Sequence, residues 1–95
     1  MITFTELLER AKTEKIAIHV PTKKQAITLL TELDKRGYTW NSGTKLTTET
    51  WYWVYKENTC YDFEPNKQVI FSSLIFYQKI GFTIIEFSDI DFKEI

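Results

Sequence analysis

Two stretches of this 95-residue chain follow the same order of elements, and this repetition limits the folds open to it. Residues 16–40 and residues 68–87 each begin with an alternating apolar segment and continue into a helix that a hydroxyl residue can cap. Each then reaches a glycine and a second extended segment, so each has the form of a βαβ unit. Parallel strands joined by a crossover helix are right-handed, and two such units favour one mixed sheet.

Two capping boxes support the helical parts of this interpretation. Thr22 and Gln25 have the spacing of a capping box, apolar residues follow on one side of the predicted helix, and Gly37 marks its end. Thr3 and Glu6 have the same spacing, which predicts a helix of about two turns near the N-terminus.

The middle of the chain carries a hairpin pattern and an irregular segment. Residues 59–63 and 67–71 alternate as the two arms of a hairpin, and Pro65 and Asn66 supply turn chemistry between them. Residues 44–58 follow neither the helical nor the strand period, so we expect an irregular segment with one helical turn.

These elements predict an α+β fold, with a small mixed β-sheet and helices on one face, in a ferredoxin-like sandwich of two βαβ units. We expect a single domain over residues 1–95, because a chain of 11.3 kDa with 43% hydrophobic residues builds one core. The other face of the sheet should stay open, and such a face is often an oligomer interface or a ligand platform. Residues 88–95 are expected to form an acidic tail.

Charge and composition argue against nucleic acid or a membrane as a partner and against secretion. The formal net charge is −1, so no global basic field attracts nucleic acid or an anionic membrane surface, and we expect neither partner. No apolar run approaches the roughly 18 residues of a membrane span, and the N-terminus lacks the pattern of a secretory leader. Cys60 is the only cysteine, which is typical of a reducing cytoplasm.

The sequence contains no convincing catalytic or metal-binding set. His19 is the only histidine, and its alternating neighbours place it on the strand face opposite the isoleucines. The pairs Asp62/Glu64 and Asp89/Asp91 each lack a third metal ligand, and no P-loop occurs. We therefore expect no enzyme, no catalytic residue, no metal and no cofactor.

Aromatic residues are concentrated in one quarter of the chain. Eight of the 15 aromatic residues lie between positions 38 and 63, and polar residues are interleaved among them. This composition is consistent with an ordinary core. It is equally consistent with a pocket whose rings stack on nucleobases and whose amide, hydroxyl and ammonium groups bind phosphates. Residues 10–45 carry eight Lys or Arg against three acids, which gives that half a local positive charge.

Two segments within and beside this cluster carry a family resemblance. With Gly37-Tyr38-Thr39-Trp40-Asn41-Ser42-Gly43 and Tyr55-Lys56-Glu57-Asn58-Thr59-Cys60-Tyr61, the chain resembles a widespread group of small proteins encoded by phages of low-GC bacteria. The similarity continues through Phe76-Tyr77 and residues 81–87. This group is similar to the anti-CBASS sponge proteins, which bind the host's cyclic oligonucleotide alarm signal and withhold it from its effector.

The resemblance implies a phage immune-evasion protein that sequesters a cyclic oligonucleotide, or a related nucleotide, without cleaving it. It also implies a homo-oligomer that acts in the cytoplasm of the bacterial host cell during infection. The residues implied to stack on the bases are Trp40, Trp53 and Tyr55. The residues implied to bond the phosphates or base edges are Ser42, Lys56, Asn58 and Thr59.

Other functions remain open on the same residues. The main alternative is a phage inhibitor that binds a host nuclease, polymerase or defence effector, with the aromatic residues 51–55 as a hot spot. A nucleic-acid binder would use the same rings, and its affinity would fall steeply with salt. An enzyme that degrades a cyclic nucleotide would consume its ligand, whereas a sponge returns it intact.

Overall fold

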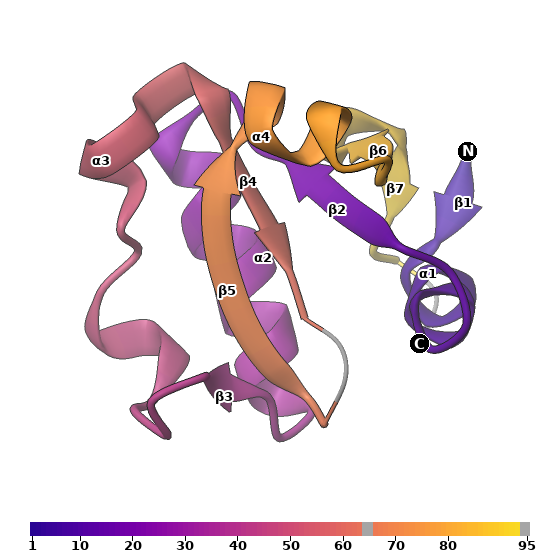
Figure 1. The fold of residues 1–95 in the computed structure, drawn as a ribbon. Helices are drawn as coiled ribbons and strands as arrows, with labels where there is room; N and C mark the ends of the chain where they lie inside the picture. The colour runs from indigo at the N-terminus through magenta and orange to yellow at the C-terminus, as the bar shows by residue number, and fades with distance from the viewer. Residues whose placement is uncertain (64–65, 94–95) are drawn as a thin grey trace.

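The computed structural model of the protein describes residues 1–63 and 66–93 (Figure 1). Five strands form one sheet in the order β3-β5-β4-β2-β6. Their bounds are β2 Ile16–His19, β3 Thr39–Trp40, β4 Thr59–Asp62, β5 Gln68–Ser73 and β6 Thr83–Glu86. The strand β4 is antiparallel to both of its neighbours, whereas β2 pairs with β6, and β3 with β5, in parallel. The predicted mixed sheet is therefore confirmed.

Both predicted capping boxes are formed. Helix α1 (Phe4–Ala11) begins after Thr3, whose side chain accepts from the Glu6 backbone while the Glu6 carboxylate accepts from the Thr3 backbone. Helix α2 (Lys23–Lys35) begins after Thr22, which exchanges the same pair of bonds with Gln25. Satisfying the free amides of the first helical turn in this way stabilises each helix start.

The α+β class is confirmed, and the element order is compatible with the two predicted βαβ units. The first unit is β2-α2-β3, and the second is β5-α4-β6, where α4 (Leu74–Lys79) is capped by the Ser73 side chain. Following the pairings across the sheet, the two strands of each unit run in the same direction.

The main core lies between the sheet and the helices α1 and α2. Strand residues alternate between faces, so Ile16 and Ile18 of β2 point toward these helices together with Tyr61 of β4 and Val69 of β5. Helical residues of the same cluster are Phe4, Leu7, Ala11, Ala26, Leu29, Leu30 and Leu33. This core includes Trp40 and so holds the end of β3 in place.

Helix α4 corrects the prediction that all helices lie on one face. Its residue Tyr77 is fully buried against Ala17 of β2 and Cys60 of β4, on the face opposite the main core. In Figure 1, α2 runs behind the sheet and α4 lies in front of its upper end. The physical reason is that β2, β4 and β6 carry apolar side chains on both faces, and this second face also needs cover.

The C-terminal segment is more than the acidic tail that was predicted. Strand β1 (Ile2–Thr3) pairs in parallel with β7 (Ile90–Asp91), next to the short 3₁₀ helix η3 (Phe87–Asp89). Ile90 is buried, and the ring of Phe92 lies 4.8 Å from that of Phe4. The apolar residues among the acids close this end of the core, while residues 94–95 lie outside the described part of the chain.

The segment 44–58 is irregular, as predicted, and contains three short helical pieces. These are η1 (Leu46–Thr48), α3 (Tyr52–Tyr55) and η2 (Lys56–Asn58). The hairpin arms that follow pair with Tyr61 opposite Phe71. Of the predicted turn, Asn66 is described with a positive φ of 66°, whereas Pro65 and the neighbouring Glu64 lie outside the described residues.

Candidate functional site

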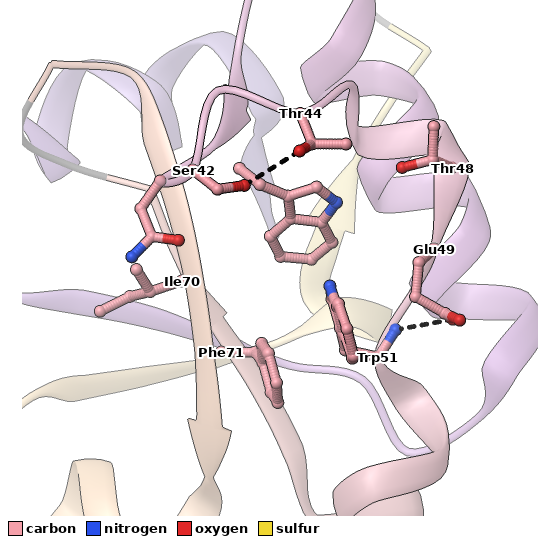
Figure 2. Close-up of a pocket in the computed structure, with 9 residues that line it drawn as sticks. Ser42, Thr44, Thr48, Glu49, Trp51, Ile70 and Phe71 are labelled. Atoms are coloured by element: carbon pink, nitrogen blue, oxygen red, sulfur yellow. Dashed lines mark hydrogen bonds between the residues drawn. The ribbon is translucent and has the colours of Figure 1, made fainter.

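A pocket of about 360 Å³ opens beside the sheet where β3 ends (Figure 2). It is lined by Trp40, Asn41, Ser42, Thr44, Thr48, Glu49, Trp51, Ile70 and Phe71. Figure 2 shows Ser42 and Thr44 at one end of the pocket and Trp51 and Phe71 at the other. The end of β3, the irregular segment and strand β5 therefore meet at a single place.

Phe71 is the central ring of the aromatic wall. Its ring stacks on Trp51, with the planes 5° apart and the centroids separated by 5.7 Å. The centroids of Trp40 and Tyr55 lie 6.2 Å and 6.0 Å from it, both in edge-on arrangements. Such pairs add stability beyond the burial of apolar area. Trp40, Trp51 and Phe71 all line the pocket.

The edge of β5 is open beside this wall. Strand β3 pairs only with Gln68 and Val69, and the last bond runs from the Asn41 amide to the Val69 carbonyl, at 3.1 Å. Residues two apart in a strand direct their backbone groups to the same side, so Phe71 presents its N–H and C=O where β3 has ended. Within the described ranges, 1–63 and 66–93, no strand pairs with Phe71 on this side.

Glu49 holds Trp51 in an uncommon backbone conformation. Trp51 has φ 60° and ψ 11°, in the left-handed region that bulky side chains rarely adopt. The Oε1 atom of Glu49 accepts from the amides of Thr50 and Trp51, at 2.8 Å and 3.2 Å. Backbone strain of this kind costs about 1–3 kcal/mol and is often found at functional sites. Here it fixes the position of the Trp51 ring.

A buried donor and a bonded pair of hydroxyls lie beside the pocket. The indole Nε1 of Trp40 is buried and has no hydrogen-bond partner among the described residues. The hydroxyls of Ser42 and Thr44 bond each other at 3.0 Å, which orders the exposed end of the pocket. Burying an unsatisfied donor costs free energy, and the Trp40 indole carries this cost beside the pocket.

The pocket has acidic character. Glu49 is the only charged side chain among the described residues that line it, and no lysine or arginine joins it there. The nearby ammonium of Lys45 bonds the Asp34 carboxylate at 3.0 Å. The interior therefore suits a flat group with N–H donors better than a phosphate, which would have to remain at the rim.

The structure brings together only some of the residues that the sequence singled out. Trp40 and Ser42 line the pocket, and Tyr55 contacts it through the ring of Phe71. Trp53 is 62% exposed and touches the pocket only through Trp51, at 6.0 Å between centroids. The other three are set apart: Lys56 and Asn58 are exposed on η2, and Thr59 is fully buried in β4.

Sequence reasoning missed Phe71, Trp51 and Glu49 as parts of this site. Phe71 lies two positions after Val69 in β5 and shares its core-facing side. The alternation of this strand was therefore the signal that could have placed Phe71 near the aromatic cluster. The role of Glu49 depends on the left-handed turn at Trp51, which no pattern in the sequence indicates.

The other reactive groups lie away from the pocket. Burial raises the pKa of the Cys60 thiol to about 12, so it is a poor nucleophile. His19 bridges two segments: Nδ1 lies 2.7 Å from Oε1 of Glu86, and Nε2 lies 2.7 Å from the Glu57 carbonyl. Within the part of the chain that the structure describes, no group of three or more His, Cys, Asp or Glu side chains could hold a metal ion.

No protein-family model matches this chain, and comparison with curated proteins and with solved structures finds no match either. Among the described residues, no helix combines the length and the apolar character that crossing a membrane requires.

Proposed function

We propose that this protein binds a nucleotide signal of the cyclic oligonucleotide class and sequesters it without cleaving it. The observation that carries the proposal is the pocket in which the rings of Trp40, Trp51 and Phe71 meet the polar side chains of Ser42, Thr44 and Glu49. Every nucleobase has a flat face, and stacking on aromatic side chains contributes about 1–3 kcal/mol per base.

The size of the pocket suits one base at a time. Small-molecule sites span about 300–1,000 Å³, and this pocket, at about 360 Å³, is near the lower limit. One base with part of its sugar is a reasonable occupant. The phosphates of a cyclic oligonucleotide would then lie at the rim, where Asn41, Ser42 and Thr44 are exposed.

Sequestration fits the chemistry of the lining better than hydrolysis does. The hydroxyls of Ser42 and Thr44 bond each other, and neither contacts an imidazole that could activate it, because His19 bridges Glu86 and Glu57 elsewhere. The proposal includes a homo-oligomer acting in the cytoplasm of an infected bacterium. Exposed Ile75 and Phe76 on α4 offer apolar surface for such an assembly.

A thermal-shift screen tests the proposal directly. The purified protein is heated with cyclic dinucleotides, cyclic trinucleotides and isomers of cyclic ADP-ribose in turn. A ligand at about 1,000 times its Kd should stabilise the fold by about 4 kcal/mol and raise Tm by more than ~10 °C. The bound ligand should be recovered chemically intact after denaturation. Absence of a shift with every ligand would overturn the proposal.

Helix α3 supports a second candidate function, inhibition of a host protein such as a nuclease, polymerase or defence effector. Trp53, Val54 and Tyr55 are 62%, 40% and 36% exposed on consecutive positions, and exposed aromatic side chains are typical of interface hot spots. This candidate predicts that Trp53→Ala abolishes capture of one host protein from an extract. Heating and filtering the extract separates the two functions, because a small ligand survives this treatment and a protein partner does not.

A further inference from the structure

We infer that the base held in this pocket is guanine, recognised along its Watson–Crick edge by Glu49. The inference rests on the proposed function and names the base for which the site is built. It starts from the charge of the pocket, since Glu49 is the one charged group among the described lining residues.

The Glu49 carboxylate is already positioned by the fold. Its Oε1 atom accepts from the amides of Thr50 and Trp51, which orients the carboxylate plane, and no hydrogen bond engages Oε2 among the described residues. An ionised carboxylate only accepts hydrogen bonds, and two oxygens can receive two parallel N–H donors. The ligand edge that faces Glu49 must therefore carry donors.

Guanine is the base that satisfies this condition. Its Watson–Crick edge presents the N1–H and N2–H₂ donors side by side, whereas adenine and cytosine each place an unprotonated ring nitrogen beside their amino group. Uracil has a single N–H flanked by two carbonyl oxygens. A carboxylate would repel these lone pairs, so Glu49 discriminates by repulsion as well as by attraction.

The remaining polar groups complement the acceptors of guanine. The exposed Asn41 side chain carries an N–H₂ donor at the same pocket, beside the hydroxyls of Ser42 and Thr44. The O6 and N7 atoms of guanine are both acceptors, whereas adenine offers only N7 on that side of the ring. The Trp51 and Phe71 rings, 5° from parallel, supply the stacking surface.

The first test needs no variant of the protein. Binding of cyclic di-GMP, cyclic di-IMP and cyclic di-AMP is measured by titration calorimetry, because these three ligands differ only in their bases. Inosine lacks the N2 amino group and keeps N1–H and O6. We expect the Kd of cyclic di-GMP to be about tenfold below that of cyclic di-IMP and further below that of cyclic di-AMP.

Glu49→Gln then tests the residue. Glutamine keeps a carbonyl oxygen for the amides of Thr50 and Trp51, and it replaces the free oxygen with an N–H₂ donor. Affinity for cyclic di-GMP should fall about tenfold, and the preference over cyclic di-AMP should disappear. The matched control is Glu57→Gln, the same chemical change on exposed η2 outside the pocket, which should leave both affinities unchanged.

The outcomes separate this inference from the proposed function. Equal affinity for the three dinucleotides, a preference for adenine, or a guanine preference that Glu49→Gln leaves intact would each overturn the guanine assignment. If none of the three binds while another ligand of the wider screen does, the assignment is wrong and nucleotide binding stands. If no ligand in the wider screen binds, both fail. Near-UV circular dichroism shows whether the variant keeps its aromatic packing.

Discussion

Trp51 and Phe71 stack with their ring planes 5° apart, although they come from an irregular loop and from a strand 20 positions further along the chain. The stack links the segment 44–58 to the sheet at the point where β3 has ended. Tyr61 strengthens the same connection, because its hydroxyl donates to the Thr50 carbonyl. The loop is therefore held by specific contacts on both sides of Trp51, and these contacts shape the pocket.

Removing the central ring should cost far more stability than removing an exposed one. Phe71→Ala loses ring contacts to Trp40, Trp51 and Tyr55, and we expect the free energy of unfolding to fall by about 2–4 kcal/mol. Trp53→Ala, which removes a larger but 62% exposed ring, should change it by less than about 1 kcal/mol. Urea unfolding measures both variants. Comparable losses would contradict the central role of Phe71.

Lys56 occupies a backbone conformation that favours glycine. Its φ of 51° and ψ of −125° at the end of α3 are unfavourable for a residue with a Cβ atom. We expect Lys56→Gly to raise the free energy of unfolding by about 1 kcal/mol, measured by chemical denaturation.

Lys56→Ala is the control, because it removes the charge and keeps the Cβ atom, and it should bring no such gain. Comparing Lys56→Ala with the natural protein isolates the effect of the ammonium group. If Lys56 binds a phosphate, as the sequence resemblance implies, both variants should weaken ligand binding equally while only the glycine stabilises the fold.

The local parts of this fold could be predicted from the sequence because short-range chemistry decides them. In the capping boxes, the side chains of Thr3 and Thr22 accept hydrogen bonds from backbone amides three residues away. Gly37 ends α2 with a φ of 86°. The pairing of β1 with β7 joins the two ends of the chain, and a two-residue strand leaves no readable period. The cover that α4 gives to the second sheet face depends on Tyr77, whose burial only the assembled sheet decides.

The candidate site was predicted in part for a similar reason. The concentration of aromatic residues pointed to the region that holds the pocket, and Trp40 and Ser42 line it. The aromatic wall of the pocket depends on Phe71, which lies opposite Tyr61 in the pairing of β4 with β5. It also depends on the left-handed backbone conformation of Trp51. Neither follows from residue types alone, because both arise when distant segments meet.

Cys60 should be protected from alkylation in the folded protein. The side chain is fully buried, and burial raises the pKa of its thiol to about 12, so little thiolate exists near pH 8. We expect labelling by iodoacetamide to be at least about 100-fold slower in buffer than in denaturant, as measured by mass spectrometry. Rapid labelling of the folded protein would show that α4, which covers Cys60 through Tyr77, opens readily.

Asp62 lies on the same sheet face as Cys60 and is only 5% exposed. Neither its Oδ1 atom nor the nearby Tyr77 hydroxyl has a well-formed hydrogen bond among the residues described. Burial raises the pKa of the Asp62 carboxyl from 3.8 to about 6, although the neighbouring Tyr77 hydroxyl favours the ionised form. The folded protein therefore binds a proton at Asp62 more tightly than the unfolded chain does.

This difference makes the stability of the protein depend on pH. The contribution of Asp62 is fully present below pH 4, where both states are protonated, and it is lost as pH rises through about 6. A difference of roughly 2 pKa units corresponds to at most about 3 kcal/mol.

Asp62→Asn is neutral at every pH, so it should be more stable than the natural protein at pH 7.5, and the difference should shrink toward pH 4. Urea unfolding at pH 4, 6 and 7.5 measures this change, with Asp89→Asn as an exposed control. A stability difference that stays constant with pH would show that Asp62 is ionised at no cost in the folded state.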